Sequence, residues 1–233
     1  RQFWYSSPCG GPGELINAFL EDKRGDMHSW EVWHHGQPFE HYYKALPRFC
    51  SEFGFQSLPS LETIARFAPR DQWNITAPVF DHHQRNRRGN SIITSTMTMY
   101  FRMPEGFPSF AYLSQVQQAL AIKTAVEYWR SLRPNCMGAL YWQLNDNWPV
   151  CSWSSLDYGG KWKLLHHAAR RFYAPLMITA FRKDPKIVEI WAVNDFMNDC
   201  EAEIVIAVRD FSGTVRKSET VKIGLPAGSS TEI

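Results

Sequence analysis

The residue best suited to chemistry in this sequence is Glu52, the one carboxylate within segment 48–59 (Arg-Phe-Cys-Ser-Glu-Phe-Gly-Phe-Gln-Ser-Leu-Pro). Such an apolar and aromatic run is typical of a buried strand, where an unpaired charge costs several kcal/mol. Glu52 must therefore be held by partners. The residue types leave two interpretations open: a structural carboxylate that pairs with an arginine such as Arg48, or a carboxylate that takes part in catalysis.

Aromatic side chains beside amides and carboxylates are the main compositional signal. The 233 residues include 10 Trp, 9 Tyr and 15 Phe. Segments 30–33 (Trp-Glu-Val-Trp) and 141–148 (Tyr-Trp-Gln-Leu-Asn-Asp-Asn-Trp) combine them with polar groups. A pyranose suits such a surface, because its C–H face stacks on flat rings while its hydroxyls form hydrogen bonds. The composition thus favours a carbohydrate ligand, whereas scattered residues such as Trp73 and Trp191 are expected to fill a core.

Charge and cysteine usage argue against several other classes. The net charge is +2, and the short basic run 85–88 is too small for the footprint of a nucleic-acid duplex. No apolar stretch is long enough to span a membrane, and no signal peptide is recognisable. Five widely spaced cysteines predict reduced thiols, with no metal and no cofactor. We therefore expect neither nucleic acid nor membrane as a partner, and these features favour a cytoplasmic protein.

The elements that would position Glu52 alternate along residues 1–175. Strands are expected at 1–7, 27–30, 48–59 and 137–144, and helical segments at 14–21, 38–46, 61–67, 114–131 and 161–172. Segment 69–110 is expected to be irregular with only short periodic pieces, either as a functional loop or with short helices. Ser114 with Gln117 reads as a capping box at a helix start. Repeated βα units imply parallel strands, and four of them make half of a (β/α)8 barrel. The carboxyl ends of its strands, where such barrels do chemistry, would carry Ser6/Ser7, His28/Trp30, Glu52 and Trp142/Asn145.

The pattern changes after Pro175. Segments 187–193, 201–208 and 214–223 alternate apolar and polar residues and are separated by turn residues, which predicts hairpin-connected antiparallel strands. This stretch is shorter than the roughly 100 residues of an immunoglobulin-like sandwich. We therefore expect an α/β chain with half of a barrel in 1–175 and a partial β-sandwich in 176–233, cut from a longer polypeptide.

Three long motifs carry a family resemblance: 25–33, 47–59 and 141–150, with further similarity over 152–163 and 168–175. They closely resemble β-mannosidases of glycoside hydrolase family 2. The resemblance implies the second half of a TIM barrel, strands five to eight, followed by the start of an antiparallel immunoglobulin-like β-sandwich. It also implies a retaining exo-glycosidase that removes terminal non-reducing β-D-mannose from an oligosaccharide or glycoconjugate.

The resemblance also implies roles for particular residues. Glu52 matches the catalytic nucleophile, and Trp142 matches the tryptophan that floors the sugar subsite and precedes a non-proline cis peptide. Further substrate-site positions are His28, Trp30, Asn145, Asp146 and Trp148, where Asp146 could equally well structure its loop. In the family the acid/base glutamate follows an asparagine at the end of strand four, and the chain contains no Asn-Glu dipeptide. The chain is therefore expected to be inactive alone and to need the remainder of the same polypeptide.

Two alternatives remain open at this point. A sister family 2 activity, such as β-galactosidase, β-glucuronidase or exo-glucosaminidase, would differ by only a few hydroxyl contacts. A non-catalytic carbohydrate-binding fragment would also explain the aromatic residues, but it would have no use for a carboxylate at the end of an apolar strand.

Overall fold

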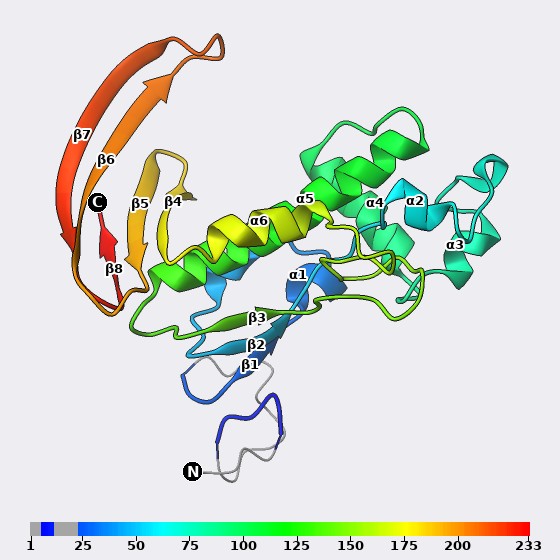
Figure 1. Ribbon diagram of the computed structural model, residues 1–233, viewed down its shortest axis with the longest axis horizontal. Coiled ribbons are helices and arrows are strands. Elements are labelled where there is room, and N and C mark those ends of the chain that lie inside the picture. The colour runs from blue at the N-terminus through cyan, green and yellow to red at the C-terminus, as the bar shows by residue number, and fades with distance from the viewer. Residues whose placement is uncertain (1–5, 12–22) are drawn as a thin grey trace.

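The computed structural model describes residues 6–11 and 23–233 of the chain (Figure 1). The expected helix at 14–21 and most of the expected strand at 1–7 lie outside these residues. The described part comprises a small parallel sheet with helices packed along it, followed by an antiparallel region that ends the chain.

Three short parallel strands lie side by side in chain order. They are β1 (Met27–Ser29), β2 (Cys50–Phe53) and β3 (Ala139–Tyr141). The predicted parallel pairing is confirmed for these strands, with His28 opposite Glu52 and Phe53 opposite Tyr141. Parallel strands present their carboxyl ends at one edge of a sheet, so this register brings the ends of all three segments together.

Helical segments follow each of these strands in the chain. They are α1 (Glu31–His34), the 3-10 helices η1 (Phe39–Lys44) and η2 (Arg70–Gln72), α2 (Leu61–Ile64), α3 (Pro78–His82), α4 (Gly89–Tyr100), α5 (Phe107–Ser131) and α6 (Leu164–Phe172). Helices α5 and α6 pack together and run alongside each other over the sheet in Figure 1. Ser60 caps α2 as expected, because its hydroxyl accepts a hydrogen bond from the Thr63 N–H.

Alternation along β2 separates the core from the site. Phe53 is fully buried, and its ring meets Trp129 of α5 edge-on at a centroid distance of 4.8 Å. Phe55 packs in the same way on Trp33 at 5.0 Å. Because successive side chains of a strand point to opposite faces, a buried Phe53 turns the neighbouring Glu52 away from the helices.

Segment 69–110 contains the short helices η2 and α3, which the sequence left open, but also the 12-residue helix α4, which the expected irregularity does not cover. This helix is rich in Ile and Thr, whose helix propensity is weak. Its apolar residues Ile92, Ile93 and Met97 are buried in the core. Tertiary packing therefore overrides the local propensity, which is why the sequence pattern did not reveal the helix.

The predicted capping box at Ser114 is also wrong. Helix α5 begins at Phe107, after Gly106 with φ +75° and with Pro108 in its first turn. Both residues favour a helix start at this point. Ser114 lies inside the helix, where its hydroxyl donates to the carbonyl of Ala111 at 2.7 Å and accepts from the Leu58 N–H at 3.0 Å.

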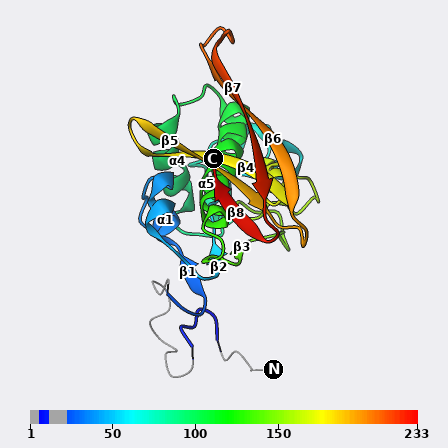
Figure 2. The same cartoon turned by 90° about the vertical axis from the view of Figure 1, so that its left-hand side faces the viewer.

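The last part of the chain is antiparallel, as expected. Its strands are β4 (Leu176–Asp184), β5 (Ile187–Asn194), β6 (Cys200–Arg209), β7 (Val215–Leu225) and β8 (Ser229–Glu232). The sequence patterns found β5, β6 and β7 but not β4 or β8. Strands β4, β5 and β8 form one sheet, and β6 and β7 form a long curved hairpin that projects from the molecule (Figures 1 and 2).

The end of α5 joins the two parts. The buried guanidinium of Arg130 donates to the carbonyls of Phe172 (2.5 Å) and Ala174 (2.9 Å) and to the carboxylate of Asp195 (2.8 Å). The Ser230 hydroxyl donates to the carbonyl of Ser131 at 2.7 Å.

All five cysteines are free, as predicted, and four of them are buried. Within residues 6–11 and 23–233, no helix is long and apolar enough to cross a membrane.

Candidate active site

Glu52 lies at the carboxyl end of β2, the middle strand of the parallel sheet. Its side chain is 27% exposed, so it is only partly buried. One carboxylate oxygen, Oε1, accepts a hydrogen bond from the indole Nε1–H of Trp30 at 3.0 Å, and the other, Oε2, lies 3.7 Å from Nδ1 of His28. Arg48 does not pair with Glu52; its guanidinium donates to the side-chain oxygen of Asn135. The carboxylate is thus held by one hydrogen bond from an indole and lies near an imidazole, while part of it faces solvent.

Trp30 can reach Glu52 because Gly54 leaves room beside it. A Cβ added at Gly54 would lie 2.4 Å from the backbone oxygen of Trp142, 3.0 Å from Cδ1 of Trp153 and 3.1 Å from Cη2 of Trp30. Real Cβ atoms essentially never approach another heavy atom to 2.4 Å. Only glycine therefore allows the two indoles and the Trp142 carbonyl to converge two residues after Glu52.

Trp142 follows β3 directly and is fixed next to the end of β2. Its N–H donates to the carbonyl of Phe53 at 2.7 Å, and the peptide bond from Trp142 to Gln143 is cis, as predicted. The indole is 45% exposed. An exposed indole at the end of the strand next to β2 is a platform on which the apolar face of a sugar ring can stack.

Behind Glu52, a chain of polar groups leads to Asp26. Nε2 of His28 lies 3.1 Å from the hydroxyl of Ser7, and that hydroxyl donates to Oδ2 of Asp26 at 2.6 Å. The same carboxylate accepts hydrogen bonds from the hydroxyl of Ser51 and, at 2.8 Å, from the N–H of Cys9. Asp26 is 8% exposed. His28 is therefore part of a connected network and not merely a packed ring.

The loop after β3 is built around buried Asp146. Its carboxylate accepts hydrogen bonds from Ser152 (2.7 Å) and Ser154 (2.6 Å) and a longer one from Gln143 (3.4 Å). The Nζ of Lys163, which is 1% exposed, donates to Ser154 at 3.4 Å and to two backbone carbonyls. These contacts favour the loop-structuring role of Asp146 that the sequence left open.

Burial governs the protonation of this pair. Burial raises the pKa of Asp146, although Lys163 and the two serine hydroxyls oppose that shift. Burial lowers the pKa of Lys163 to about 8, against the opposing attraction of Asp146. Desolvation outweighs the attraction in both groups, which are bridged by the hydroxyl of Ser154 and are not in direct contact.

The remaining predicted substrate positions lie farther along the same loop. Asn145 is exposed, its carbonyl accepts from Gln143 Nε2 at 3.0 Å, and it forms an isolated bridge with Leu156. Trp148 is half-buried and lies against His83 with a ring-centroid distance of 5.0 Å. The structure thus brings Glu52, His28, Trp30 and Trp142 together, whereas the contacts of Asn145 and Trp148 are with the loop and with His83.

Sequence reasoning missed three parts of this site. Asp26 is the first of them, although it stands two residues before His28 and so shares a strand face with it. Gly54 was read only as part of a motif. Lys163 was given no role. The sequence around Gly54 and around Lys163 does not indicate their roles, because the residues that they contact lie on distant segments.

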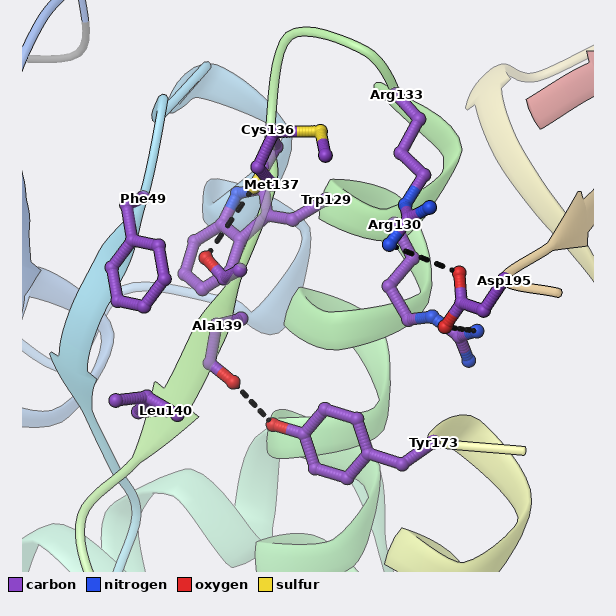
Figure 3. Close-up of a pocket in the computed structure, with 11 residues that line it drawn as sticks. Phe49, Trp129, Arg130, Arg133, Cys136, Met137, Ala139, Leu140, Tyr173 and Asp195 are labelled. Atoms are coloured by element: carbon purple, nitrogen blue, oxygen red, sulfur yellow. Dashed lines mark hydrogen bonds and ion pairs between the residues drawn. The ribbon is translucent and has the colours of Figure 1, made fainter. Parts of the chain in front are cut away.

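One cavity in the described part of the chain is lined by none of the predicted site residues. A cavity of about 300 Å³ lies near the amino ends of β2 and β3, lined by Phe49, Gly138 and Ala139 together with Arg130, Arg133 and Asp195. Figure 3 shows both arginines turned toward Asp195, and the hydroxyl of Tyr173 donating to the Ala139 carbonyl at 2.7 Å. In the described part of the chain, no group of three or more His, Cys, Asp or Glu side chains could hold a metal ion.

Comparison with known proteins gives matches over most of the chain. The family model of the Mannosidase Ig/CBM-like domain matches residues 186–233. The β-mannosidase of Capra hircus is 35% identical over 230 residues, which cover 91% of this chain and 26% of that protein. The β-mannosidase B of Thermothelomyces thermophilus is 31% identical, over 86% of this chain and 27% of its own length.

Solved structures agree with these matches. The β-D-mannosidase of Dictyoglomus thermophilum superposes with a TM-score of 0.85 at 32% identity, covering 92% of this chain and 26% of that one. The exo-chitosanase CsxA of Amycolatopsis orientalis has a TM-score of 0.71 at 16% identity, and this shows a shared fold alone. The chain spans about a quarter of the length of the β-mannosidases it matches. Within that span, its sequence and fold match those of the β-mannosidases of glycoside hydrolase family 2.

Proposed function

We propose that this chain carries the nucleophile half of a retaining exo-β-mannosidase, which removes terminal non-reducing β-D-mannose residues from an oligosaccharide or glycoconjugate. Glu52 is the proposed nucleophile, and Trp142 is the proposed floor of the mannose subsite. The observation that carries the proposal is the surroundings of Glu52: a partly exposed carboxylate, fixed by Trp30, at the end of the central parallel strand.

A purely structural carboxylate would have different surroundings. Asp195 provides the contrast, because two guanidinium groups hold it, Arg130 at 2.8 Å and Arg133 at 3.1 Å. Glu52 instead has one neutral N–H donor and an imidazole beyond hydrogen-bond distance, and its side chain is 27% exposed. Such a carboxylate keeps an oxygen available for attack. Since Trp30 holds Oε1, we expect Oε2 to be the attacking atom.

The proposed reaction has two steps. In the first, Oε2 of Glu52 attacks the anomeric carbon, the glycosidic bond breaks, and an acid group protonates the departing oxygen. In the second, the same group removes a proton from water, the water oxygen attacks the anomeric carbon, and the Glu52 carboxylate leaves. The second carboxyl group must stand about 5 to 5.5 Å from Glu52 in such enzymes.

We further propose that β1, β2 and β3 are strands six, seven and eight of a (β/α)8 barrel in a longer polypeptide. The consecutive parallel order of the strands supports this, as does the span of only about a quarter of the relatives. The domain boundary is proposed near residue 175, just before β4 begins at Leu176. The acid/base group would then come from the preceding half of the barrel.

Replacement of Glu52 tests the assignment. In the full-length protein, Glu52→Gln should lower kcat for a nitrophenyl β-mannoside by about 10⁴-fold or more. Glu62→Gln, on the surface of α2 with a side chain 70% exposed, is the matched control and should leave kcat unchanged. Azide should restore turnover to Glu52→Ala. Activity of Glu52→Gln within tenfold of wild type would refute the role of Glu52.

The sugar specificity needs a separate measurement. The full-length protein should show a higher kcat/KM for the β-mannoside than for the matching β-galactoside, β-glucuronide and β-glucosaminide. A preference for one of the other sugars would keep the nucleophile but replace the proposed substrate.

A further inference from the structure

A buried lysine holds the loop after β3 from two sides. Lys163 immediately precedes α6 and is 1% exposed. Its backbone N–H donates to the carbonyl of Ser155 at 2.9 Å. Its side-chain Nζ donates to the carbonyl of Ser152 at 3.3 Å and to the hydroxyl of Ser154 at 3.4 Å, and it reaches the carbonyl of Ser57 at 3.2 Å. One residue thus ties this loop both to α6 and to the chain just beyond β2.

The part of the loop that Lys163 holds is also the part that supports Trp142. The N–H of Gln143, the residue after Trp142, donates to the carbonyl of Trp153 at 3.2 Å. The carbonyl of Gln143 accepts from the N–H of Ser155 at 3.0 Å. The backbone on the carboxyl side of the exposed indole is therefore paired with the segment that the lysine fixes.

Trp153 connects the same segment to the proposed nucleophile. Its indole meets the indole of Trp30 edge-on at a centroid distance of 6.0 Å, and that of buried Trp33 at 5.8 Å. Trp30 in turn donates to Oε1 of Glu52 at 3.0 Å. A shift of the segment would therefore disturb both the proposed floor of the sugar subsite and the indole that fixes the carboxylate.

The surroundings of Nζ fit an ammonium group. An ammonium has three hydrogens, and Nζ faces three acceptors, because the hydroxyl of Ser154 gives its own hydrogen to Asp146 at 2.6 Å. A neutral amine has two hydrogens and would leave one of these oxygens without its donor. Burial lowers the pKa of Lys163 to about 8, against the attraction of Asp146. The third hydrogen is therefore present at pH 7 and is lost as the pH rises above 8.

Three other ionisable groups face this ammonium: Asp146, Cys151 and Asp157. Burial raises the pKa of Cys151 to about 12, so its thiol is neutral at pH 8. Burial also acts to raise the pKa of Asp157, but hydrogen bonds to its carboxylate outweigh burial and lower the pKa, so it is an anion. Burial raises the pKa of Asp146, which accepts hydrogen bonds from two serine hydroxyls as an ionised carboxylate does. The charge of Lys163 is thus the one in this cluster that we expect to change between pH 7 and 9.5.

We propose that Lys163 is a positioning residue for the mannose subsite. Its ammonium group holds the loop segment that supports Trp142 and, through Trp153, the indole of Trp30. When the ammonium loses a proton, the segment loses one of its contacts and the stacking surface for the sugar is held less firmly. The inference rests on the proposed role of Trp142 as the floor of the subsite, but the link between Lys163 and Trp142 can be measured without any sugar.

Stability and sugar affinity should then respond to pH in opposite directions. Removing the proton from a buried lysine relieves the cost of burying its charge, so the free energy of unfolding should rise above pH 8. The same step removes a hydrogen-bond donor from the support of Trp142, which should weaken sugar binding by about 3- to 10-fold. A lysine that served only the stability of the fold would leave the sugar affinity unchanged.

Binding of a nitrophenyl thio-β-mannoside to the full-length protein, followed by tryptophan fluorescence, tests the effect on the subsite. This analogue is uncharged, and its sulfur linkage resists hydrolysis. The wild-type Kd should rise about 3- to 10-fold between pH 7 and pH 9.5. Lys163→Met should bind at pH 7 at least as weakly as wild type binds at pH 9.5, with no further change on raising the pH. Lys161→Met is the matched control, since that side chain is 58% exposed, and it should behave like wild type.

Fluorine NMR of full-length protein labelled with fluorotryptophan measures the link without sugar. The Trp142 signal, assigned by its loss in Trp142→Phe, should shift between pH 7 and pH 9.5 in wild type and in Lys161→Met. It should stay constant in Lys163→Met, whose folding at pH 7 is checked by urea unfolding. The wild-type titration needs no substitution at Lys163, so the test does not depend on the folding of that variant. A Trp142 signal that is constant in wild type, or that still shifts in Lys163→Met, would overturn the proposal.

The two proposals fail separately. If Trp142→Ala binds the thio-β-mannoside as tightly as wild type, the proposed floor of the subsite falls, while the fluorine signal still decides whether Lys163 positions Trp142. If Trp142→Ala binds weakly but wild type and Lys163→Met share one Kd at both pH values, the positioning role of Lys163 is overturned and the subsite remains.

Discussion

A methyl group added at Gly54 is the sharpest perturbation that the structure offers. The new Cβ would lie 2.4 Å from the carbonyl oxygen of Trp142, and within 3.0 to 3.1 Å of Trp153 and Trp30. The first contact is to backbone, which cannot rotate away as a side chain can. Gly54→Ala therefore has to displace the strand end that carries Trp142, or else β2 itself.

The size of the effect follows from the distances. Ordinary contact begins at about 3.4 Å, so the Trp142 carbonyl must move by about 1 Å. Overpacking of this kind typically costs about 1 to 3 kcal/mol of stability. A displacement of about 1 Å in an active site can lower the rate by about 10²-fold. We therefore expect the activity of Gly54→Ala to fall by more than its stability explains.

Urea unfolding followed by tryptophan fluorescence gives the stability, and kcat/KM on a nitrophenyl β-mannoside gives the activity, both in the full-length protein. Gly224→Ala is the matched control. Gly224 is an exposed strand residue whose added Cβ would meet only the side-chain end of Glu201, at 3.2 Å. It should unfold at the wild-type urea concentration or slightly above it, because alanine restricts the unfolded chain. Equal behaviour of the two variants would refute the close packing around Gly54.

Three further predictions concern other contacts. Trp30→Phe removes the N–H donor to Glu52 and should lower kcat/KM on the same β-mannoside by about 10- to 100-fold with little change in stability; an unchanged rate would contradict its role. The pKa of Lys163 is about 8 in the folded protein and 10.5 in an exposed lysine, so the unfolded state holds the proton more tightly. The free energy of unfolding should therefore rise with pH, by at most about 3 kcal/mol between pH 8 and 10.5. Lys163→Met should abolish that rise, as measured by urea unfolding at pH 7 and pH 10. Asp195→Ala leaves the guanidinium of Arg130 without its carboxylate and should cost about 1.5 to 3 kcal/mol in urea unfolding; a loss below 0.5 kcal/mol would show the ion pair to be dispensable.

Features with a local pattern could be predicted from the sequence. The apolar run around Glu52 predicted a strand at 48–59, of which β2 covers only Cys50–Phe53, and alternation predicted β5, β6 and β7. Helix α4 escaped because Ile and Thr are weak helix formers, and only the burial of Ile93 and its neighbours against the core makes that segment helical. The predicted start of α5 lies seven residues too late, because the sequence around the buried Ser114 has the pattern of a helix N-cap.

The candidate site likewise contains residues that a local sequence pattern predicts and residues that it does not. Glu52 and Trp142 stand out by residue type within their segments, but their partners do not. Asp26 reaches Ser7 across 19 positions, and Lys163 reaches the carbonyl of Ser57 across 106. Such contacts depend on how strands and loops converge in space, and no local spacing encodes them. The alternative that Arg48 pairs with Glu52 was reasonable from sequence, but Arg48 is bonded to Asn135.

Covalent trapping tests the central claim most directly. The full-length protein should be incubated with a 2-fluoro β-mannoside carrying a good leaving group, and the labelled peptide identified by mass spectrometry. A fluorinated sugar attached to Glu52, at one equivalent per active site and absent from Glu52→Gln, is the predicted result. A label on another carboxylate, or inactivation of Glu52→Gln at the wild-type rate, would contradict the assignment of Glu52 as the nucleophile.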